Sequence, residues 1–316
     1  MLSRGRSFRN NKYRTLINDQ QDSCTVFGEV SLRHYDDVVP LGVQRNRDGS
    51  QQIKINGKPA TSAAQLAELV PTQVINPDAL AILEGGPAIR RQFVDWGVFH
   101  VEHRFLHHWQ RANRALKQRN EMLRRGKMDA SLMAAWDRVL IEHAEKLQQL
   151  RGSYVERLKP LFEKALNKLT DIDLPELSLA AGWDERMGLA EVFKRSAEQD
   201  RKAGFTQHGP HRADLRVRLD GRKVADLLSR GQQKIIVSAL KLAQGALFNL
   251  VNGRQCIFLV DDLVAELDAE HRQRLFKSLV ETESQLWVTS IDADVFDVEG
   301  NYRAFHVKQG NITPAN

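Results

Sequence analysis

Two carboxylates close the most uniformly apolar run of the sequence. Residues 257–260 read Ile-Phe-Leu-Val and are followed by Asp261 and Asp262. Such a run is typical of a central parallel strand buried on both faces, and ligands of open α/β sheets bind at the carboxyl ends of the strands. Asp261 is therefore a candidate ligand for Mg²⁺, and Asp262 a candidate to orient or deprotonate an attacking water. The alternative is that the two acids only cap the following loop.

A second group of residues could bind an anion. Ser229, Arg230, Gly231 and Gln232 lead into an apolar helical stretch that reaches Leu242. Serine is a favourable N-cap, and glycine lets the backbone approach a ligand closely. The free N–H groups and the positive dipole end of a helix start attract phosphate. An ordinary capped helix is the alternative interpretation.

Periodicity predicts the strands that must position these groups. Residues 24–56 mostly alternate in the way of strands, with Asp48 and Gly49 as a hairpin turn, and a short helix is expected over 62–69. A strand over 285–289 follows a helix over 270–280, which completes a strand–helix–strand unit with residues 257–260. The fold class is therefore α/β.

The middle of the chain is predicted to be helical. From about residue 90 to residue 169 the apolar residues recur three, four or seven positions apart. Two long helices are expected to join near Gly126, with Asp129 as the N-cap of the second and Pro160 as a kink or a break in it. This region is expected to form a packed helical subdomain.

Charge and composition bound the partners. The 316 residues carry a formal charge of +6, and the pI of about 9.3 permits nucleic-acid binding without requiring it. Arg111, Arg114, Lys117 and Arg119 lie close together in the helical region and are candidate DNA contacts, with a solvated helix face as the alternative. The sequence has no run of 18 apolar residues and no secretory signal, so no membrane association is expected. The two cysteines stand in apolar runs, which fits a reducing, cytoplasmic setting.

The segment that begins at Ser229 resembles the signature motif of ABC-type ATPases, and residues 257–262 resemble their Walker B segment. The two segments also follow one another in the same order as in that class. The spacing from Asp261 through Asp262 to Asp268 matches the run of Walker B and D-loop in that class. Asp262 stands where many members carry glutamate. Ser290 stands where many carry a histidine, which puts the γ-phosphate sensor in doubt. The class often has a glutamine that links the ATP site to the helical lobe, and here Asn76 and Gln73 both remain candidates for that position.

Three further segments narrow the resemblance to the RecF family of ABC/SMC-type ATPases. They are residues 84–96, which begin Glu-Gly-Gly-Pro; residues 116–120, Leu-Lys-Gln-Arg-Asn; and residues 208–215, His-Gly-Pro-His-Arg-Ala-Asp-Leu. The resemblance covers about residues 5–312. His208 and His211 are not expected to be metal ligands, since no third ligand is placed near them.

The resemblance implies an ABC-type head, formed by residues 1–85 and 206–316, with residues 86–205 as an inserted helical lobe. It implies ATP and Mg²⁺ as cofactors, with Asp261 on the metal and Asp262 catalytic, and with Ser229, Arg230, Gly231, Gln232, Asp268 and Asn76 at the nucleotide. It also implies a homodimer formed around ATP, binding to gapped DNA and single-strand/double-strand junctions, and release after hydrolysis. The implied partners are RecR and RecO, and the implied setting is the cytoplasmic nucleoid, in replication restart, recombinational repair and the SOS response.

The sequence departs from this pattern at one place. It contains no Gly-x-x-x-x-Gly-Lys-Ser/Thr, the loop that supplies backbone N–H groups and a lysine to the phosphates. In the RecF family this loop precedes the segment that resembles residues 5–9, so the first strand and the loop are expected to be missing. Either Met1 lies inside a longer protein, or a short form exists that does not hold ATP in the usual way. The second case would make the chain a DNA- or RecR-binding module without ATP turnover, so enzyme activity stays undecided.

Overall fold

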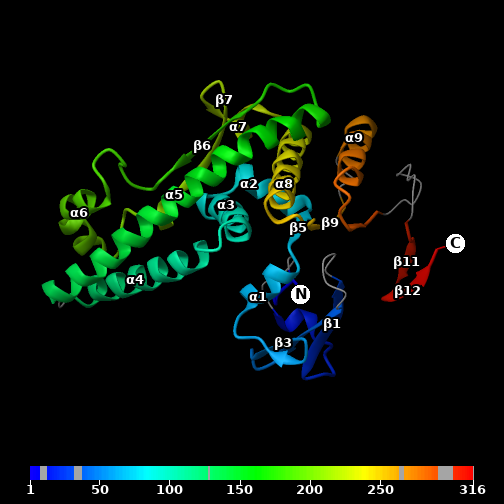
Figure 1. Cartoon of the computed structure of the whole chain (residues 1–316), viewed down its shortest axis with the longest axis horizontal. Helices are drawn as coiled ribbons and strands as arrows, with labels where there is room; N and C mark the ends of the chain where they lie inside the picture. The colour runs from blue at the N-terminus through cyan, green and yellow to red at the C-terminus, as the bar shows by residue number, and fades with distance from the viewer. Residues whose placement is uncertain (8–12, 32–37, 127–128, 263–266, 291–301, 316) are drawn as a thin grey trace.

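The computed structural model describes residues 1–7, 13–31, 38–126, 129–262, 267–290 and 302–315 (Figure 1). The strands are β1 (Ser23–Ser31), β2 (Val38–Asn46), β3 (Gln51–Ile55), β4 (Lys58–Pro59), β5 (Thr72–Ile75), β6 (Glu176–Ala180), β7 (Asp214–Leu219), β8 (Arg222–Lys223), β9 (Ile257–Val260), β10 (Leu286–Val288), β11 (Phe305–Lys308) and β12 (Asn311–Pro314). The helices are α1 (Ala63–Leu69), α2 (Ala81–Glu84), α3 (Pro87–Val101), α4 (Phe105–Arg125), α5 (Ala130–Leu169), α6 (Leu189–Ala203), α7 (Val224–Leu227), α8 (Arg230–Asn252) and α9 (Ala269–Val280).

The strand predicted to be central is central. β9 lies between β5 and β10 in a parallel sheet, with Val260 opposite both Ile75 and Val288. The predicted burial on both faces is wrong, however. Phe258 and Val260 are buried, whereas Ile257 and Leu259 are only half-buried, because the helices described here pack mainly on the face that Phe258 presents.

Helix α8 is the central helix of the core. It contacts β5 on one side and α5 on the other, so it lies between the sheet and the long helix (Figure 1). Gly245 makes this close packing possible, since a Cβ there would lie 2.7 Å from the Phe258 ring. By length and composition alone α8 could cross a membrane, but 67% of its most apolar window is buried inside the fold. The apolar character of α8 is therefore explained by its place in the core.

The N-terminal strands form a separate small unit. β1 to β4 pair in order as an antiparallel sheet, and Gly49, with φ of +92°, lies in the predicted turn between β2 and β3. Leu41 and Val43 of this sheet pack against Leu66 of α1 in a second apolar cluster. The burial of alternate residues explains the strand-like pattern of the sequence.

The predicted pair of long helices is present. α4 and α5 form an antiparallel hairpin that extends away from the parallel sheet containing β5 and β9 (Figure 1). Gly126 ends α4 with φ of +69°, and Asp129 caps α5 by accepting from the N–H groups of Ser131 and Leu132. The possible break at Pro160 is wrong, because α5 continues through this residue to Leu169.

The segments that resemble the RecF family hold the hairpin to β7. Arg90 of α3 donates to both carboxylate oxygens of Asp214, at 2.6 and 3.1 Å. Arg151 of α5 donates to both oxygens of Asp95, at 2.7 and 2.9 Å, and to the carbonyl of Pro210. Bidentate arginine–carboxylate pairs are strong and directional, so these residues fix the orientation of α3 and α5 relative to residues 208–215.

Candidate functional site

The acid pair lies at the carboxyl edge of the parallel sheet. The N–H of Asp261 donates to the Ile75 carbonyl at 2.8 Å, which places Asp261 beside the end of β5. Thr289, directly after β10, donates from Oγ1 to Asp261 Oδ1 at 2.9 Å and accepts from the N–H of Asp262 at 3.2 Å. The Thr289 hydroxyl therefore fixes both the side chain of the first acid and the backbone of the second.

The two acids differ in exposure and backbone. Asp261 is half-buried, whereas Asp262 is exposed and has φ of +54°, in the left-handed region that few non-glycine residues adopt. Carboxylate and hydroxyl oxygens are hard donors of the kind that Mg²⁺ binds. Asp261, with the Thr289 hydroxyl beside it, therefore presents oxygen ligands of the kind that fit a magnesium ion.

The start of α8 forms a capping box. Ser229 Oγ accepts from the N–H of Gln232 at 3.3 Å, and Gln232 Oε1 accepts from the N–H of Ser229 at 2.9 Å. Ser229 and Arg230 are exposed. The space beside Gly231 is open, since a Cβ added there would come no closer to another atom than 4.0 Å, to Ser229 Oγ. The first N–H groups of a helix have no partner inside the helix, so this tip can receive an anion.

A small pocket lies between the N-terminal half of α8 and Asp262, the second acid of the pair. Its lining includes Asn76 after β5, Asp262 after β9, and Lys234 and Ser238 on α8. Burial lowers the pKa of Lys234, the Arg230 charge lowers it further, and the Asp262 carboxylate opposes both. The Lys234 ammonium and the Asp262 carboxylate therefore lie close together in the pocket, where β5 and β9 end.

The structure separates the two residues left open for the glutamine position. Asn76 is half-buried and lines the pocket. Gln73 is 1% exposed and donates from Nε2 to Gln244 Oε1 in the core, at 3.1 Å. Of the two, Asn76 is thus the residue that reaches the candidate site.

Asp268 serves as the N-cap of α9. Its carboxylate accepts from the N–H of His271 at 2.9 Å and contacts His271 Nδ1 at 2.6 Å. The backbone and side-chain hydrogen bonds from His271 lower the pKa of Asp268. Glu266, between the acid pair and Asp268, lies outside the described residues.

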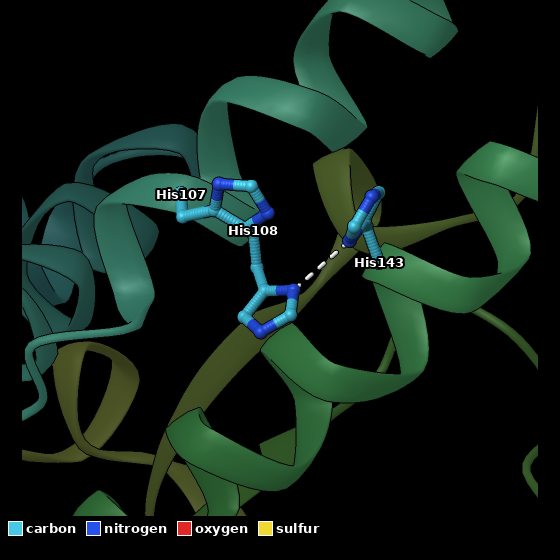
Figure 2. A group of neighbouring side chains, drawn as sticks. All are labelled: His107, His108 and His143. Atoms are coloured by element: carbon cyan, nitrogen blue, oxygen red, sulfur yellow. Dashed lines mark hydrogen bonds between the residues drawn. The ribbon is translucent and has the colours of Figure 1, made fainter.

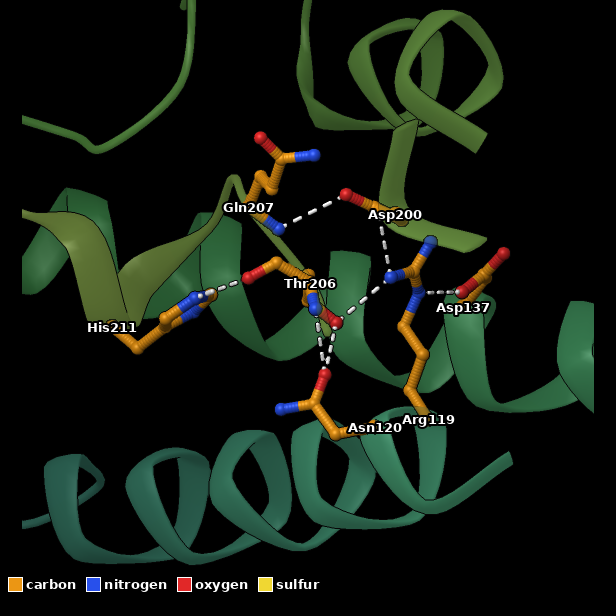
Figure 3. Close-up of polar contacts among 7 residues, drawn as sticks. All are labelled: Arg119, Asn120, Asp137, Asp200, Thr206, Gln207 and His211. Carbon is orange, nitrogen blue, oxygen red and sulfur yellow. Dashed lines mark hydrogen bonds and ion pairs between the residues drawn. The ribbon is translucent and has the colours of Figure 1, made fainter. Parts of the chain in front are cut away.

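Three of the four predicted DNA contacts are exposed on α4: Arg111, Arg114 and Lys117. The prediction for Arg119 is wrong. Arg119 is 3% exposed and is enclosed by α4, α5 and α6 (Figure 3), where it donates to Asp137 at 2.7 Å and to the fully buried Asp200 at 2.8 Å. A guanidinium bound to two carboxylates inside the fold is unavailable to DNA.

The surroundings of Arg119 connect α4 to residues 206–211. Thr206 Oγ1 accepts from Arg119 at 2.8 Å, and Asn120 Oδ1 accepts from both the N–H and the hydroxyl of Thr206 (Figure 3). His211 donates from Nε2 to the Thr206 carbonyl at 3.0 Å. Burial lowers the pKa of His211 to about 4, so this imidazole is neutral. Arg119, Asn120 and His211 all belong to segments that resemble the RecF family, and here their contacts are structural.

Sequence reasoning missed three residues of the site: Thr289, Lys234 and Ser238. A usable signal existed for Thr289, because the end of a parallel strand next to β9 must reach the same edge of the sheet. For Lys234 and Ser238 the signal is their spacing of four residues, which places both on one face of α8.

Comparisons with known proteins bear on this arrangement. A family model described as "RecF/RecN/SMC N terminal domain" matches residues 1–313. The "DNA replication and repair protein RecF" of Pseudomonas syringae pv. syringae (strain B728a) is 48% identical over 99% of this chain and 86% of its own length. The chain belongs to the RecF family. The RecF of Pseudomonas fluorescens (strain SBW25) is 47% identical over the same shares.

Solved structures agree with this assignment to the RecF family. The structure titled "recombination mediator protein RecF-ATP in RecFOR pathway" matches with a TM-score of 0.86 at 25% identity, over all of this chain and 86% of the other. An SMC head bound to the C-winged helix domain of ScpA matches with a TM-score of 0.52 at 13% identity, over 93% of this chain and 74% of the other. The second match concerns the fold alone. Both place the RecF-family chain in the ABC-type α/β class that the sequence predicts.

Proposed function

We propose that this chain acts in DNA replication and repair as an ATP-controlled DNA-binding protein. The observation that carries the proposal is the pocket at the carboxyl edge of the sheet, where Asn76, Lys234 and Asp262 converge. Membership of the RecF family supplies the biological setting. The partners proposed are RecO and RecR, on gapped DNA and at single-strand/double-strand junctions, during replication restart and the SOS response in the cytoplasm.

The roles of the residues follow from their positions. Asp261, held by the Thr289 hydroxyl, is assigned to Mg²⁺, and the exposed Asp262 is assigned to the attacking water. The magnesium ion, when bound, neutralises charge that develops on the phosphates. Asn76 links this edge to the helices through the pocket. The division into a head of residues 1–85 and 206–316 and a lobe of residues 86–205 remains a prediction.

The tip of α8 is assigned to the nucleotide of a second copy. Ser229, Arg230, Gly231 and Gln232 are accessible at the surface, and the exposed Asp268 at the start of α9 is assigned to the same interface. A helix start that meets phosphate carried by another subunit would make dimerisation depend on ATP. Loss of the γ-phosphate on hydrolysis would then weaken the dimer and release DNA.

The test is DNA binding with and without ATP. Fluorescence anisotropy on gapped DNA should show tighter binding with ATP and Mg²⁺ than without them. Ser229→Arg should remove the ATP-dependent gain without changing affinity in the absence of ATP, because it blocks only the contact with the second copy. Asp262→Asn should keep the ATP-dependent gain in DNA affinity. The gain should be lost more slowly over time, because the variant hydrolyses ATP more slowly. A gain that survives Ser229→Arg unchanged would contradict the assignment of α8.

A second function is favoured by one observation, the lack of a Gly-x-x-x-x-Gly-Lys-Ser/Thr motif in these 316 residues. In that case the chain binds DNA or RecR without turning over ATP. Equal DNA affinity with and without ATP, together with RecR binding, would support this function over the first. Reading the genomic DNA in frame ahead of Met1 gives an independent check, since a glycine-rich loop ending Gly-Lys-Ser or Gly-Lys-Thr restores the ATPase.

The DNA contacts are proposed to be Arg111, Arg114 and Lys117, mostly to phosphates and hence salt-dependent. The double variant Arg114→Glu, Lys117→Glu should lower the slope of log affinity against log salt by about 1.4–1.8, since each of the two phosphate contacts contributes roughly 0.7–0.9. The matched control is Arg222→Glu, Lys223→Glu on β8, which makes the same change of charge at two exposed positions away from α4. Equal slopes for the two double variants would remove α4 from the DNA site.

A further inference from the structure

Three histidines meet where α4 begins. His107 and His108 lie in the first turn of α4, and His143 reaches them from α5 (Figure 2). One ring nitrogen of each lies within 4.8 Å of those of the other two, and His108 Nδ1 is 2.9 Å from His143 Nδ1. Across the described residues, this is the group of three or more His, Cys, Asp or Glu side chains close enough to share a metal ion.

The spacing of the nitrogens suits a divalent transition metal. Zinc binds imidazole nitrogen at about 2.0–2.1 Å, so two nitrogens on a tetrahedral zinc lie about 3.3 Å apart. His108 Nδ1 and His143 Nδ1, 2.9 Å apart, are slightly closer than this, and the ligand nitrogens of all three histidines lie within 4.8 Å of one another. Small side-chain rotations can therefore bring all three nitrogens to one ion without moving either helix. A proton shared by His108 and His143 uses two of the rings and leaves His107 unexplained.

The protonation state of the cluster also suits a metal. A metal ligand must be the neutral imidazole. Burial, with the neighbouring His143 and His107, lowers the pKa of His108, and burial also lowers the pKa of His143. The environment of His108 and His143 thus favours the neutral imidazole that binds a metal.

The charges around the cluster are mixed. Glu142 of α5 favours a cation here, whereas Lys146 of α5 and Arg111 of α4 oppose it. Such a balance limits the affinity, so binding in the micromolar range is expected rather than the tightness of an all-cysteine site. Imidazole ligands select Zn²⁺, Cu²⁺, Ni²⁺ or Co²⁺ over Mg²⁺ or Ca²⁺.

We propose that His107, His108 and His143 form a zinc site that fastens the base of α4 to α5. Three histidines leave the fourth position of the ion to water. The site lies away from the pocket that contains Asp262, so the proposal stands independently of the nucleotide function. Arg119 joins the same two helices nearer to Gly126. Bound zinc would form a second link between α4 and α5, at the end of the hairpin next to α3. It would thereby fix the angle between the hairpin and α3.

The test uses the whole chain, stripped of metal with a chelator and titrated with CoCl₂. Tetrahedral cobalt with imidazole ligands has visible absorption bands, so the expected result is a saturable spectrum at one cobalt per chain that ZnCl₂ abolishes. Zinc should also raise the melting temperature. His107→Ala, at an exposed position that leaves the fold intact, and His143→Ala should each lower cobalt affinity at least tenfold and remove the thermal shift.

The matched control is His306→Ala, at an exposed histidine of β11 outside the cluster. Its spectrum and melting shift should equal those of the unmodified chain. Circular dichroism of each variant without metal separates loss of binding from loss of fold. The proposal is overturned if cobalt gives no saturable bands, or if folded His107→Ala binds cobalt and zinc as the unmodified chain does.

Discussion

Replacing Arg119 by methionine should destabilise the protein far more than any change at the exposed arginines of the same helix. Arg119 is 3% exposed, and its partner Asp200 is fully buried. Methionine keeps much of the apolar stem but removes the charge. The buried carboxylate of Asp200 then retains one hydrogen bond, from the N–H of Gln207 at 3.0 Å.

The magnitude follows from the contacts that disappear. Arg119 donates to Asp137, Asp200 and Thr206 and lies 4.5 Å from the centre of the Phe193 ring. Removing one partner of a buried ion pair costs about 3–5 kcal/mol, because the remaining charge is left without compensation. Asp137 is 26% exposed and can be solvated, so most of the cost arises at Asp200. We expect a loss of about 4 kcal/mol in the free energy of unfolding.

The assay is urea unfolding followed by circular dichroism. With a slope of about 3 kcal/mol per molar, such a loss moves the midpoint by on the order of 1 M. Arg114→Met, at an exposed position of α4, is the matched control and should change stability by less than about 0.5 kcal/mol. The double variant Arg119→Met, Asp200→Asn removes both buried charges and should be more stable than Arg119→Met alone. Equal midpoints for Arg119→Met and Arg114→Met would refute the reasoning.

Three further predictions concern the core and the start of α8. Gly97→Ala should cost about 1–3 kcal/mol, because its Cβ would lie 2.0 Å from Tyr154 Oη; Gly152→Ala, in open space on α5, should instead stabilise by about 0.5–1 kcal/mol in the same urea assay. Burial lowers the pKa of His100 from 6.5 to about 4. Between these pH values the unfolded chain binds more protons than the folded chain, so the free energy of unfolding should fall as the pH drops from 6.5 to 4. His100→Gln should reduce this dependence of stability on pH. Ser229→Ala should cost about 1 kcal/mol, since it removes the N-cap acceptor of α8, and unchanged thermal unfolding would contradict this role.

Much of the secondary structure was predictable because it depends on local periodicity and on turn chemistry. The helix over 270–280, the helix start at Asp129 and the turn at Gly126 are each determined by residues adjacent in the chain. The break expected at Pro160 failed for the opposite reason. Packing of α5 along α8 stabilises the helix through the proline, and a local rule contains no such contribution.

The four predicted DNA contacts on α4 illustrate what spacing can and cannot decide. Arg119 is three positions after Leu116 and four before Leu123, so the same periodicity that predicted the apolar face places it on that face. Whether an arginine there is tolerated depends on Asp200, which is 81 positions away in sequence. The partner, and hence the structural role of Arg119, is visible only in the folded chain.

The sequence by itself determined the order of the elements, the acid pair after the central strand and the capped start of α8, because each arises from neighbouring residues. The tertiary structure decided which side chains from distant elements meet: Thr289 with Asp261, Lys234 with Asp262, and His143 with His107 and His108. These contacts depend on how helices and strands pack, and packing is fixed by the summed burial of the whole core rather than by any short pattern.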